Sequence, residues 1–356
     1  MKENKEIAWL KEANKTNMAE KHIGKQTVFL KNPPSIKATA SFVGPKEGKG
    51  PLKNDFDYII PDELWGEDSW EKAESKLVRE VFAKVLQKAK LTNDKIDYVL
   101  AGDLLNQCIA ANYGLRETEV PFFGLYGACS TMAESISIGS LVVEGGFAEN
   151  IVCMTSSHFC SAEKQFRFPL ELGSQRTPTA QWTVTGSGAV VLSSGGAGPY
   201  IKHITTGKII DLGITDANNM GAAMAPAAAD TIFAHFKDTG LQPDYYDLIV
   251  TGDLGKVGKQ ICQEILKSNG LDIESRFNDC GVMIFDAETQ DTHSGGSGCA
   301  CSATVLAGHI YKQLTQGNLK RVLFVATGAL MSPISSQQKE SIPGIAHAVA
   351  IHRTLN

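Results

Sequence analysis

The chain has 356 residues, of which 43% are hydrophobic, 21% charged and 8% aromatic, and these proportions exclude intrinsic disorder, collagen-like fibres and low-complexity architectures. The net charge of −5 argues against nucleic acid as the main partner. Eight cysteines are too few for a disulfide scaffold, and their spacings do not match those of zinc ligands, so we expect no bound metal or cofactor and a reducing environment.

The N-terminal segment reads as an extension of the fold. The first 26 residues carry six lysines and four glutamates around a short apolar stretch, Ile7–Leu10. That stretch is too short for a secretory signal, and no apolar run in the chain approaches the roughly 18 residues of a membrane span. We therefore predict a flexible extension at residues 1–24 and contact with a membrane only through partner proteins.

The first half of the chain is predicted to alternate helices with strands. A capping signal at Asp68–Glu71 and a face of apolar residues predict a helix that ends near Ala89. After it we expect a buried strand, a second strand, a glycine turn at Gly127, a helix of small residues and a third strand. Their predicted ranges are Tyr98–Ala101, Val120–Leu125, Ser130–Glu144 and Ile151–Thr155.

The second half is predicted to contain the same alternation of helices and strands. Pro226 and Asp230 predict the start of a helix that ends near Gly240. The elements expected after it are strand Leu248–Thr251, a turn at Gly295–Gly298, helix Ser302–Thr315 and strand Arg321–Thr327. Strands that alternate with helices predict parallel β-α-β crossovers in a helix-covered sheet.

The two halves also resemble each other in sequence. Leu91–Leu104 aligns with Leu241–Leu254 without a gap, and six residues are identical. Ala128–Ser130 matches Ala300–Ser302, and the match continues without gaps into the following strands. Two matches in the same order indicate a duplication. We predict a five-layer αβαβα sandwich of two halves related by pseudo-twofold symmetry, residues 25–200 and 201–356.

The duplicated halves, with a cysteine at a strand-to-helix turn in Tyr126–Thr131, resemble the thiolase and β-ketoacyl synthase superfamily. More narrowly, the sequence is similar to those of the stage V sporulation protein AD family of spore-forming bacteria. The matching segments include Ala101–Gln107, Pro121–Thr131, Thr155–His158, Ala162–Arg167, Trp182–Gly188, Thr251–Lys256, Ser294–Ser302 and Gln338–Pro343.

The resemblance implies a homodimer with a thiolase-like fold that binds dipicolinic acid (pyridine-2,6-dicarboxylate), free or as its calcium chelate. It also implies that the protein assists uptake of this acid into the developing spore. Membrane proteins of the same uptake system would be its partners, and its place would be peripheral, at the spore inner membrane.

Cys129 occupies the position of the acyl-carrying nucleophile in the resembled enzymes. Its place at a helix N-terminus predicts a lowered thiol pKa. Condensing enzymes also need a histidine base and commonly an asparagine, but Thr251–Asp253 contains no histidine and Ser294–Ser302 no asparagine. We therefore expect a non-enzymatic binding protein in which Cys129 is a relic at the pocket floor. The alternative is an acyl-transferase or condensing enzyme with Cys129 as nucleophile.

Dipicolinate is a flat dianion near neutral pH, so its site needs cations or oriented N–H groups and an apolar surface. Lys256 and Lys259 follow strand Leu248–Thr251 in a glycine-rich turn that opens a helix, which is a favourable corner for an anion. His158 is either a donor to a carboxylate or a hydrogen-bonded structural histidine.

Further residues of the turns that follow the strands are candidates for the same pocket. Asp103 and its repeat partner Asp253 either cap the following helix or reach the ligand through calcium. Asn106, Ser297 and Cys301 lie in the matching segments, Cys301 is the repeat partner of Cys129, and we expect all three, with Asp103, to bind the ligand.

Overall fold

The computed structural model describes residues 21–166 and 176–355, so all but the last four residues of the predicted extension lie outside the described part. Ten of its strands form two sets of five with the same internal order. Each set places its strands, numbered by their position within the half, in the order 3-2-4-5-1. The N-terminal set is β2 (Ser35–Val43), β4 (Tyr98–Gly102), β5 (Phe122–Gly124), β6 (Asn150–Ser157) and β8 (Gly186–Ser193). The C-terminal set is β9 (Tyr200–Thr205), β10 (Leu248–Thr251), β11 (Phe277–Asp279), β13 (Arg321–Ala329) and β14 (Gly344–His352).

Strand directions repeat as well. In each half the second strand is parallel to the third and fourth, and the fifth is antiparallel to the fourth and first. The two sets join where β2 meets β9 at Ser35 and Tyr200. This shared order and direction is what a duplicated half produces, while the division at residue 200 remains a prediction. The short strands outside the repeat are β1 (Thr27–Phe29), β3 (Tyr58–Ile59) and a separate two-stranded ribbon of β7 (Trp182–Thr183) and β12 (Gly296–Ser297).

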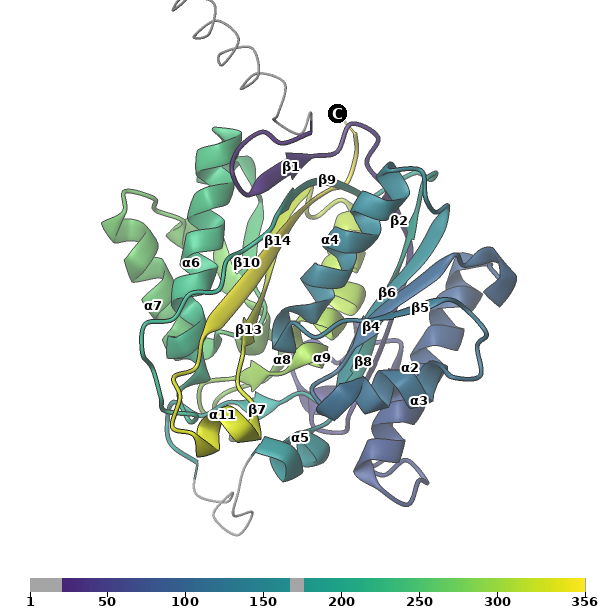
Figure 1. Ribbon diagram of the computed structural model, residues 1–356, viewed down its shortest axis with the longest axis horizontal. Helices are drawn as coiled ribbons and strands as arrows, with labels where there is room; N and C mark the ends of the chain where they lie inside the picture. The colour runs from purple at the N-terminus through teal and green to yellow at the C-terminus, as the bar shows by residue number, and fades with distance from the viewer. Residues whose placement is uncertain (1–20, 167–175, 356) are drawn as a thin grey trace, which may run out of the picture.

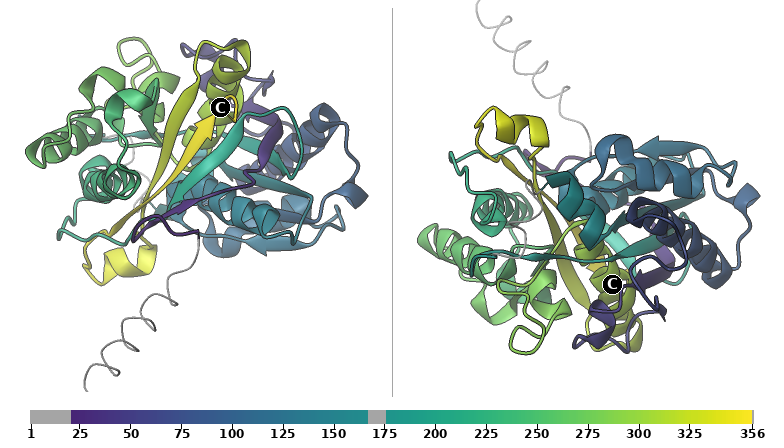
Figure 2. Two further views of the ribbon diagram at one scale, coloured as in Figure 1. Left: turned by 90° about the horizontal axis from the view of Figure 1, so that it is seen from above. Right: turned by 90° about the horizontal axis from the view of Figure 1, so that it is seen from below.

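Helices form three layers around the two halves of the sheet (Figure 1, Figure 2). The outer helices are α2 (Trp70–Ala89) and α3 (Ile109–Leu115) on one side and α6 (Met220–Thr239) and α7 (Gly255–Ser268) on the other. Between the halves lie α4 (Thr131–Glu144) and α9 (Cys299–Thr304), and a π-helical segment (Val305–Ile310) and α10 (Tyr311–Gln316) continue α9. The predicted five-layer sandwich is confirmed.

The strands carry apolar side chains on both faces of the sheet, which explains why helices cover both faces. In β6, Ile151 and Cys153 pack against the central helices, whereas Val152 and Met154 pack against α2 and its neighbours. A strand that is apolar at every position has no face for water and must be covered twice. Among the described helices, none is both long and apolar enough to span a membrane.

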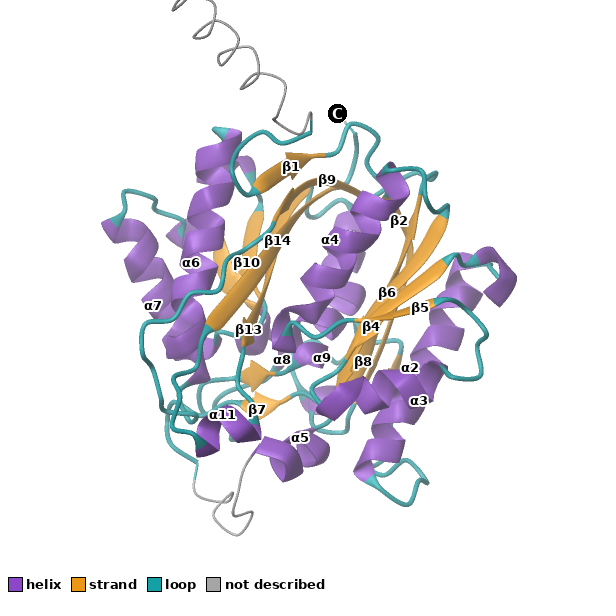
Figure 3. Ribbon diagram, in the orientation of Figure 1, coloured by secondary structure: helices purple, strands orange, loops and turns teal. Residues whose placement is uncertain are grey.

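The remaining short elements connect these layers (Figure 3). They are α5 (Phe159–Phe166), α8 (Cys280–Ile284), α11 (Pro333–Gln337), and the 3-10 turns at Glu47–Lys49, Asn93–Lys95, Asn106–Cys108, Ala128–Ser130, Pro243–Tyr245 and Glu274–Arg276.

The predicted start of α6 is wrong. The helix begins at Met220, where the Asn219 side chain accepts a hydrogen bond from Ala222 N, and Pro226 lies inside it. The stretch around Pro226 is rich in alanine, the best helix former, and these alanines are buried against β13 and β14, which outweighs the bond that proline cannot donate. The predicted end is confirmed, because Gly240 adopts the left-handed conformation that closes the helix.

Candidate functional site

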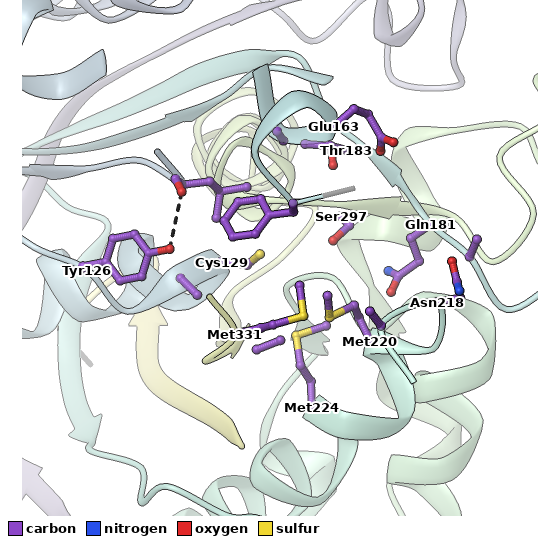
Figure 4. Close-up of a pocket in the computed structure, with 17 residues that line it drawn as sticks. Tyr126, Cys129, Glu163, Gln181, Thr183, Asn218, Met220, Met224, Ser297 and Met331 are labelled. Atoms are coloured by element: carbon purple, nitrogen blue, oxygen red, sulfur yellow. Dashed lines mark hydrogen bonds between the residues drawn. The ribbon is translucent and has the colours of Figure 1, made fainter. Parts of the chain in front are cut away.

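A pocket of about 120 Å³ opens where elements of both halves meet (Figure 4). Its walls come from the turn before α4, from α5, from the β7–β12 ribbon, from the start of α6 and from the segment that ends β13. The lining residues are Leu104, Tyr126, Ala128, Cys129, Ala162, Glu163, Phe166, Ala180, Gln181, Thr183, Ala217, Asn218, Met220, Met224, Ser297, Ala329 and Met331.

The turn that carries Cys129 is held by its own hydroxyl groups. Ser130 Oγ donates to Gly127 O at 2.6 Å, and Thr131 Oγ1 donates to Ala128 O at 2.7 Å. Strand β13 passes so close that a Cβ on Gly328 would lie 2.4 Å from Gly127 O, so only glycine fits there. This rigid turn places Cys129 at the pocket floor.

The thiol of Cys129 is not activated. Burial raises its pKa well above the ordinary value, and the neighbouring Asp253 carboxylate, which accepts the thiol hydrogen bond, raises it further. The predicted lowering of this pKa is therefore wrong. The partial positive charge of a helix N-terminus is outweighed by loss of water and by a nearby negative charge.

Asp253 connects three elements beneath the pocket. Its carboxylate accepts hydrogen bonds from Thr327 Oγ1 at 2.6 Å, Gly298 N at 3.0 Å and Ser297 Oγ at 3.1 Å. Asp253 does not cap α7, so the capping role predicted for it is wrong. The capping role predicted for Asp103 is confirmed, because its carboxylate accepts hydrogen bonds from Leu105 N and from Ala111 N in the first turn of α3, both at 2.8 Å.

The predicted anion corner at the start of α7 is already filled by the protein. The Asp279 carboxylate accepts from Leu254 N at 2.8 Å and from Gly255 N at 3.0 Å. Lys256 is exposed, and Lys259 Nζ donates to Asn278 Oδ1 at 3.2 Å. Neither lysine lines the pocket, so this part of the predicted site is corrected. Asp279 ends β11, and the parallel pairing of β11 with β10 brings its carboxylate to this helix N-terminus.

Of the two roles considered for His158, the structure shows that of a hydrogen-bonded structural histidine. The ring is fully buried outside the pocket lining, Nδ1 accepts from Cys160 N at 3.1 Å, and Nε2 therefore donates to Glu63 O at 2.8 Å. Burial lowers its pKa, so the ring is neutral at pH 7. With both nitrogens bonded inside the protein, His158 has no donor left for a ligand.

Three other candidates also lie outside the pocket lining. Asn106 is exposed in a 3-10 turn, Asp103 is buried beneath α3, and Cys301 lies in the central core. Of the eight predicted ligand-binding residues, the structure brings only Cys129 and Ser297 together at this cavity.

Most of the lining was not predicted. Met220, Met224 and Met331 gather on one apolar wall near Cys129 (Figure 4). Phe166 also belongs to the lining. Met220 and Met224 are four residues apart and share one helix face, which is a signal that could have identified them. Gln181 is the buried amide of the wall and precedes the short strand β7.

Comparisons with known proteins agree on one family. The profile of the family "Stage V sporulation protein AD" matches residues 24–352. The Stage V sporulation protein AD of Bacillus subtilis (strain 168) is 50% identical over 330 residues, which cover 93% of this chain and 97% of that protein.

Solved structures share the fold at low identity. 3-Oxoacyl-[acyl-carrier-protein] synthase III from Aquifex aeolicus VF5 superposes with a TM-score of 0.55 at 12% identity, over 90% of this chain and 99% of that one. Xanthomonas campestris OleA with bound cerulenin gives a TM-score of 0.59 at 15% identity, over 90% of this chain and 100% of that one. At such identities the likeness establishes the thiolase-like fold and nothing about activity.

Proposed function

This chain belongs to the stage V sporulation protein AD family, and from that membership we propose that it is a binding protein for dipicolinic acid that assists its uptake into the developing spore. It acts without catalysis, and membrane proteins of the same uptake system receive the ligand from it.

The observation that carries this proposal is the partner of Cys129. In a pocket that a thiolase-like fold would use for acyl transfer, the thiol donates to the buried carboxylate of Asp253 and is held protonated. A nucleophilic cysteine needs a base or a positive neighbour that favours the thiolate. The cavity is retained and the activation of its cysteine is absent, which supports binding over acyl transfer.

The lining suits a flat aromatic ring. Met220, Met224, Met331 and Phe166 offer polarizable and aromatic surface on several sides of the cavity. A few polar groups, among them Ser297 and Gln181, interrupt this surface and can orient a ring substituent.

The proposal is tested by titration calorimetry with dipicolinate. Ala217 is exposed on the rim, so Ala217→Trp can obstruct the mouth without disturbing the core. We expect saturable binding to the unaltered protein and a loss of affinity of about tenfold or more in Ala217→Trp. Lys256→Ala, outside the pocket, is the matched control and should bind as tightly as the unaltered protein.

Two results would decide against the proposal. If dipicolinate does not bind, and mass spectrometry finds Cys129 stably acylated by acyl-CoA thioesters, the protein is a condensing enzyme or acyl-transferase. A scaffold without a ligand would show neither binding nor acylation.

We also propose that the protein acts as a homodimer paired through β5. This strand ends the N-terminal set, and no other strand of the described chain pairs with its outer edge. Phe123 in β5 is 54% exposed, and Tyr126, which lines the pocket, is 46% exposed. Antiparallel pairing of β5 with its copy would satisfy the open edge and cover both rings.

The dimer is tested by analytical ultracentrifugation. A charge at the centre of the paired edge should break it, so Phe123→Asp is expected to raise the dimer dissociation constant by about tenfold or more. Phe147→Asp changes an exposed ring beyond the end of α4 and serves as the control. A monomeric unaltered protein, or a Phe123→Asp variant that remains dimeric, would rule out this interface.

A further inference from the structure

Three histidine rings pack together at the end of the sheet that lies away from the pocket. They are His203 of β9, His352 of β14 and His235 of α6. The ring centroid of His203 lies 5.9 Å from that of His235 and 6.2 Å from that of His352. His235 and His352 are buried and His203 is half-buried. A charge on any one of these rings would therefore lie in poorly hydrated surroundings.

Two of the rings keep a buried nitrogen without a partner. His203 Nδ1 and His352 Nε2 are shielded from water and make no hydrogen bond with any described residue. His235, by contrast, bonds through both nitrogens, with Thr205 Oγ1 at 2.8 Å and with Tyr246 Oη at 2.7 Å. A buried polar atom that lacks a partner has lost its bonds to water and gained none in return, so it favours any opening that lets water reach it.

The segment that covers His203 is β1, at the end of the molecule opposite strand β7 of the pocket wall (Figure 1). Phe29 of β1 packs against the His203 ring, with centroids 5.3 Å apart, and Thr27 Oγ1 shares a hydrogen bond of 3.0 Å with Thr205 Oγ1. β1 has three residues, and among the described strands it pairs with β9 alone. A strand this short, with one strand partner, belongs to the segments that open locally before the rest of a fold.

The last turn of α6 also holds β1. The Asp238 carboxylate accepts hydrogen bonds from Gln26 N and Thr27 N, both at 3.0 Å. Partial burial alone would raise the pKa of Asp238, but the N–H donors of residues 25–27 outweigh it and hold the pKa below its ordinary value. Asp238 therefore stays charged at pH 5, and mild acid leaves these two bonds in place.

The surroundings of the three rings keep them neutral. The charged and titratable groups that face them are Lys202 of β9, Arg321 of β13, Asp238 of α6, and Tyr245 and Tyr246 before β10. Burial, and then the charge of Lys202, lower the pKa of His203 to about 4, and burial and the neighbouring rings lower those of His235 and His352 to about 3. An imidazole in water titrates near 6.5, so the closed structure is fully favoured above that pH and loses stability as the pH falls from about 6.5 toward 4.

We infer that β1 is an acid-sensitive latch with His203 as its sensor: in mild acid His203 takes up a proton from solvent, and β1 leaves β9 and the last turn of α6. In the closed latch the His203 ring is covered by Phe29 and lies between two further imidazoles and Lys202, which disfavour a positive charge. Once β1 moves away, water reaches Nδ1 and solvates the imidazolium. The inference goes beyond the proposed function and involves no ligand.

Hydrogen–deuterium exchange followed by mass spectrometry tests the latch on the full chain at pH 7 and at pH 5. The rate for the peptide that contains β1 is corrected for the intrinsic effect of pH on amide exchange. For a histidine that titrates at about 6.5 in the open state and at about 4 in the closed state, the corrected rate should rise about twentyfold. Circular dichroism at pH 5 should remain that of the folded protein.

Two substitutions remove the sensor in different ways. His203→Phe keeps an aromatic ring and removes the unpaired nitrogen, so it should fold, and its corrected rates at the two pH values should agree within about threefold. His203→Gln keeps a polar group that does not titrate in this range, and it should lose the response in the same way. His22→Phe is the matched control, because it alters an exposed histidine of the segment before β1, and it should keep the twentyfold response.

Equal corrected rates at pH 7 and pH 5 in the unaltered protein overturn the inference, whether or not either variant folds. So does a folded His203→Phe or His203→Gln variant that keeps the twentyfold response. Neither result bears on dipicolinate binding at pH 7, so the proposed function is tested separately.

Discussion

Asp253→Ala is expected to lower the free energy of unfolding by about 3–5 kcal/mol, because it strips the acceptor from three donors at once, two of them buried. The donors are Thr327 Oγ1, Ser297 Oγ and Gly298 N, and they belong to β13 and to the turn that enters α9. Asp253 is 1% exposed, so water cannot replace the lost acceptor without opening the core. Urea denaturation, with the midpoint and slope compared, measures the loss.

Asp244→Ala is the matched control. Asp244 lies in the same repeat segment, Leu241–Leu254, but its carboxylate is exposed. Its effect should stay within about 0.5 kcal/mol. An Asp253→Ala variant as stable as Asp244→Ala would show that the carboxylate does not hold these elements together.

Cys129 is expected to react with iodoacetamide at pH 7 about 100-fold more slowly than an exposed cysteine, since only the thiolate reacts. Burial and the Asp253 carboxylate raise the pKa of this thiol well above its ordinary value. The sign of the pH dependence follows: the thiolate fraction grows as pH rises toward the raised pKa, so labelling should accelerate in alkaline solution. Mass spectrometry of the Cys129 peptide over time gives the rate.

Ala217→Cys supplies the reference within the same protein, because position 217 is exposed on the rim of the same pocket. Its thiol should be modified at the rate of a free cysteine. Labelling of Cys129 at a comparable rate at pH 7 would mean an activated thiol, and it would favour the acyl-transferring alternative.

The regular elements could be predicted closely where local pattern decides them. The capping signal at Asp68–Glu71 and the apolar face after it place α2 correctly, with Ser69 as the N-cap residue. Strands β4 and β10 follow from short, continuous apolar runs. The errors have a common origin: Pro226 is tolerated inside α6 because tertiary burial compensates for it, and no pattern in the sequence marks the π-helical segment in the middle of the predicted helix Ser302–Thr315.

The site was harder to predict than the fold. The resemblance and the strand-to-helix turn led to Cys129, and the matching glycine-rich segment led to Ser297. Local sequence alone predicts an anion site at the lysines after β10. Asp279 occupies the same helix N-terminus, and only the parallel pairing of β10 with β11 brings it there.

The sequence by itself determined the duplicated architecture and the place of Cys129 at a strand-to-helix turn, because periodicity, capping and repeats are properties of residues close together in the chain. The tertiary structure alone decided what surrounds that cysteine. A pKa depends on burial and on charges within a few ångströms, and Asp253 reaches Cys129 only after the two halves pack. The same packing brings the methionines of α6 and the Gln181 amide to one cavity.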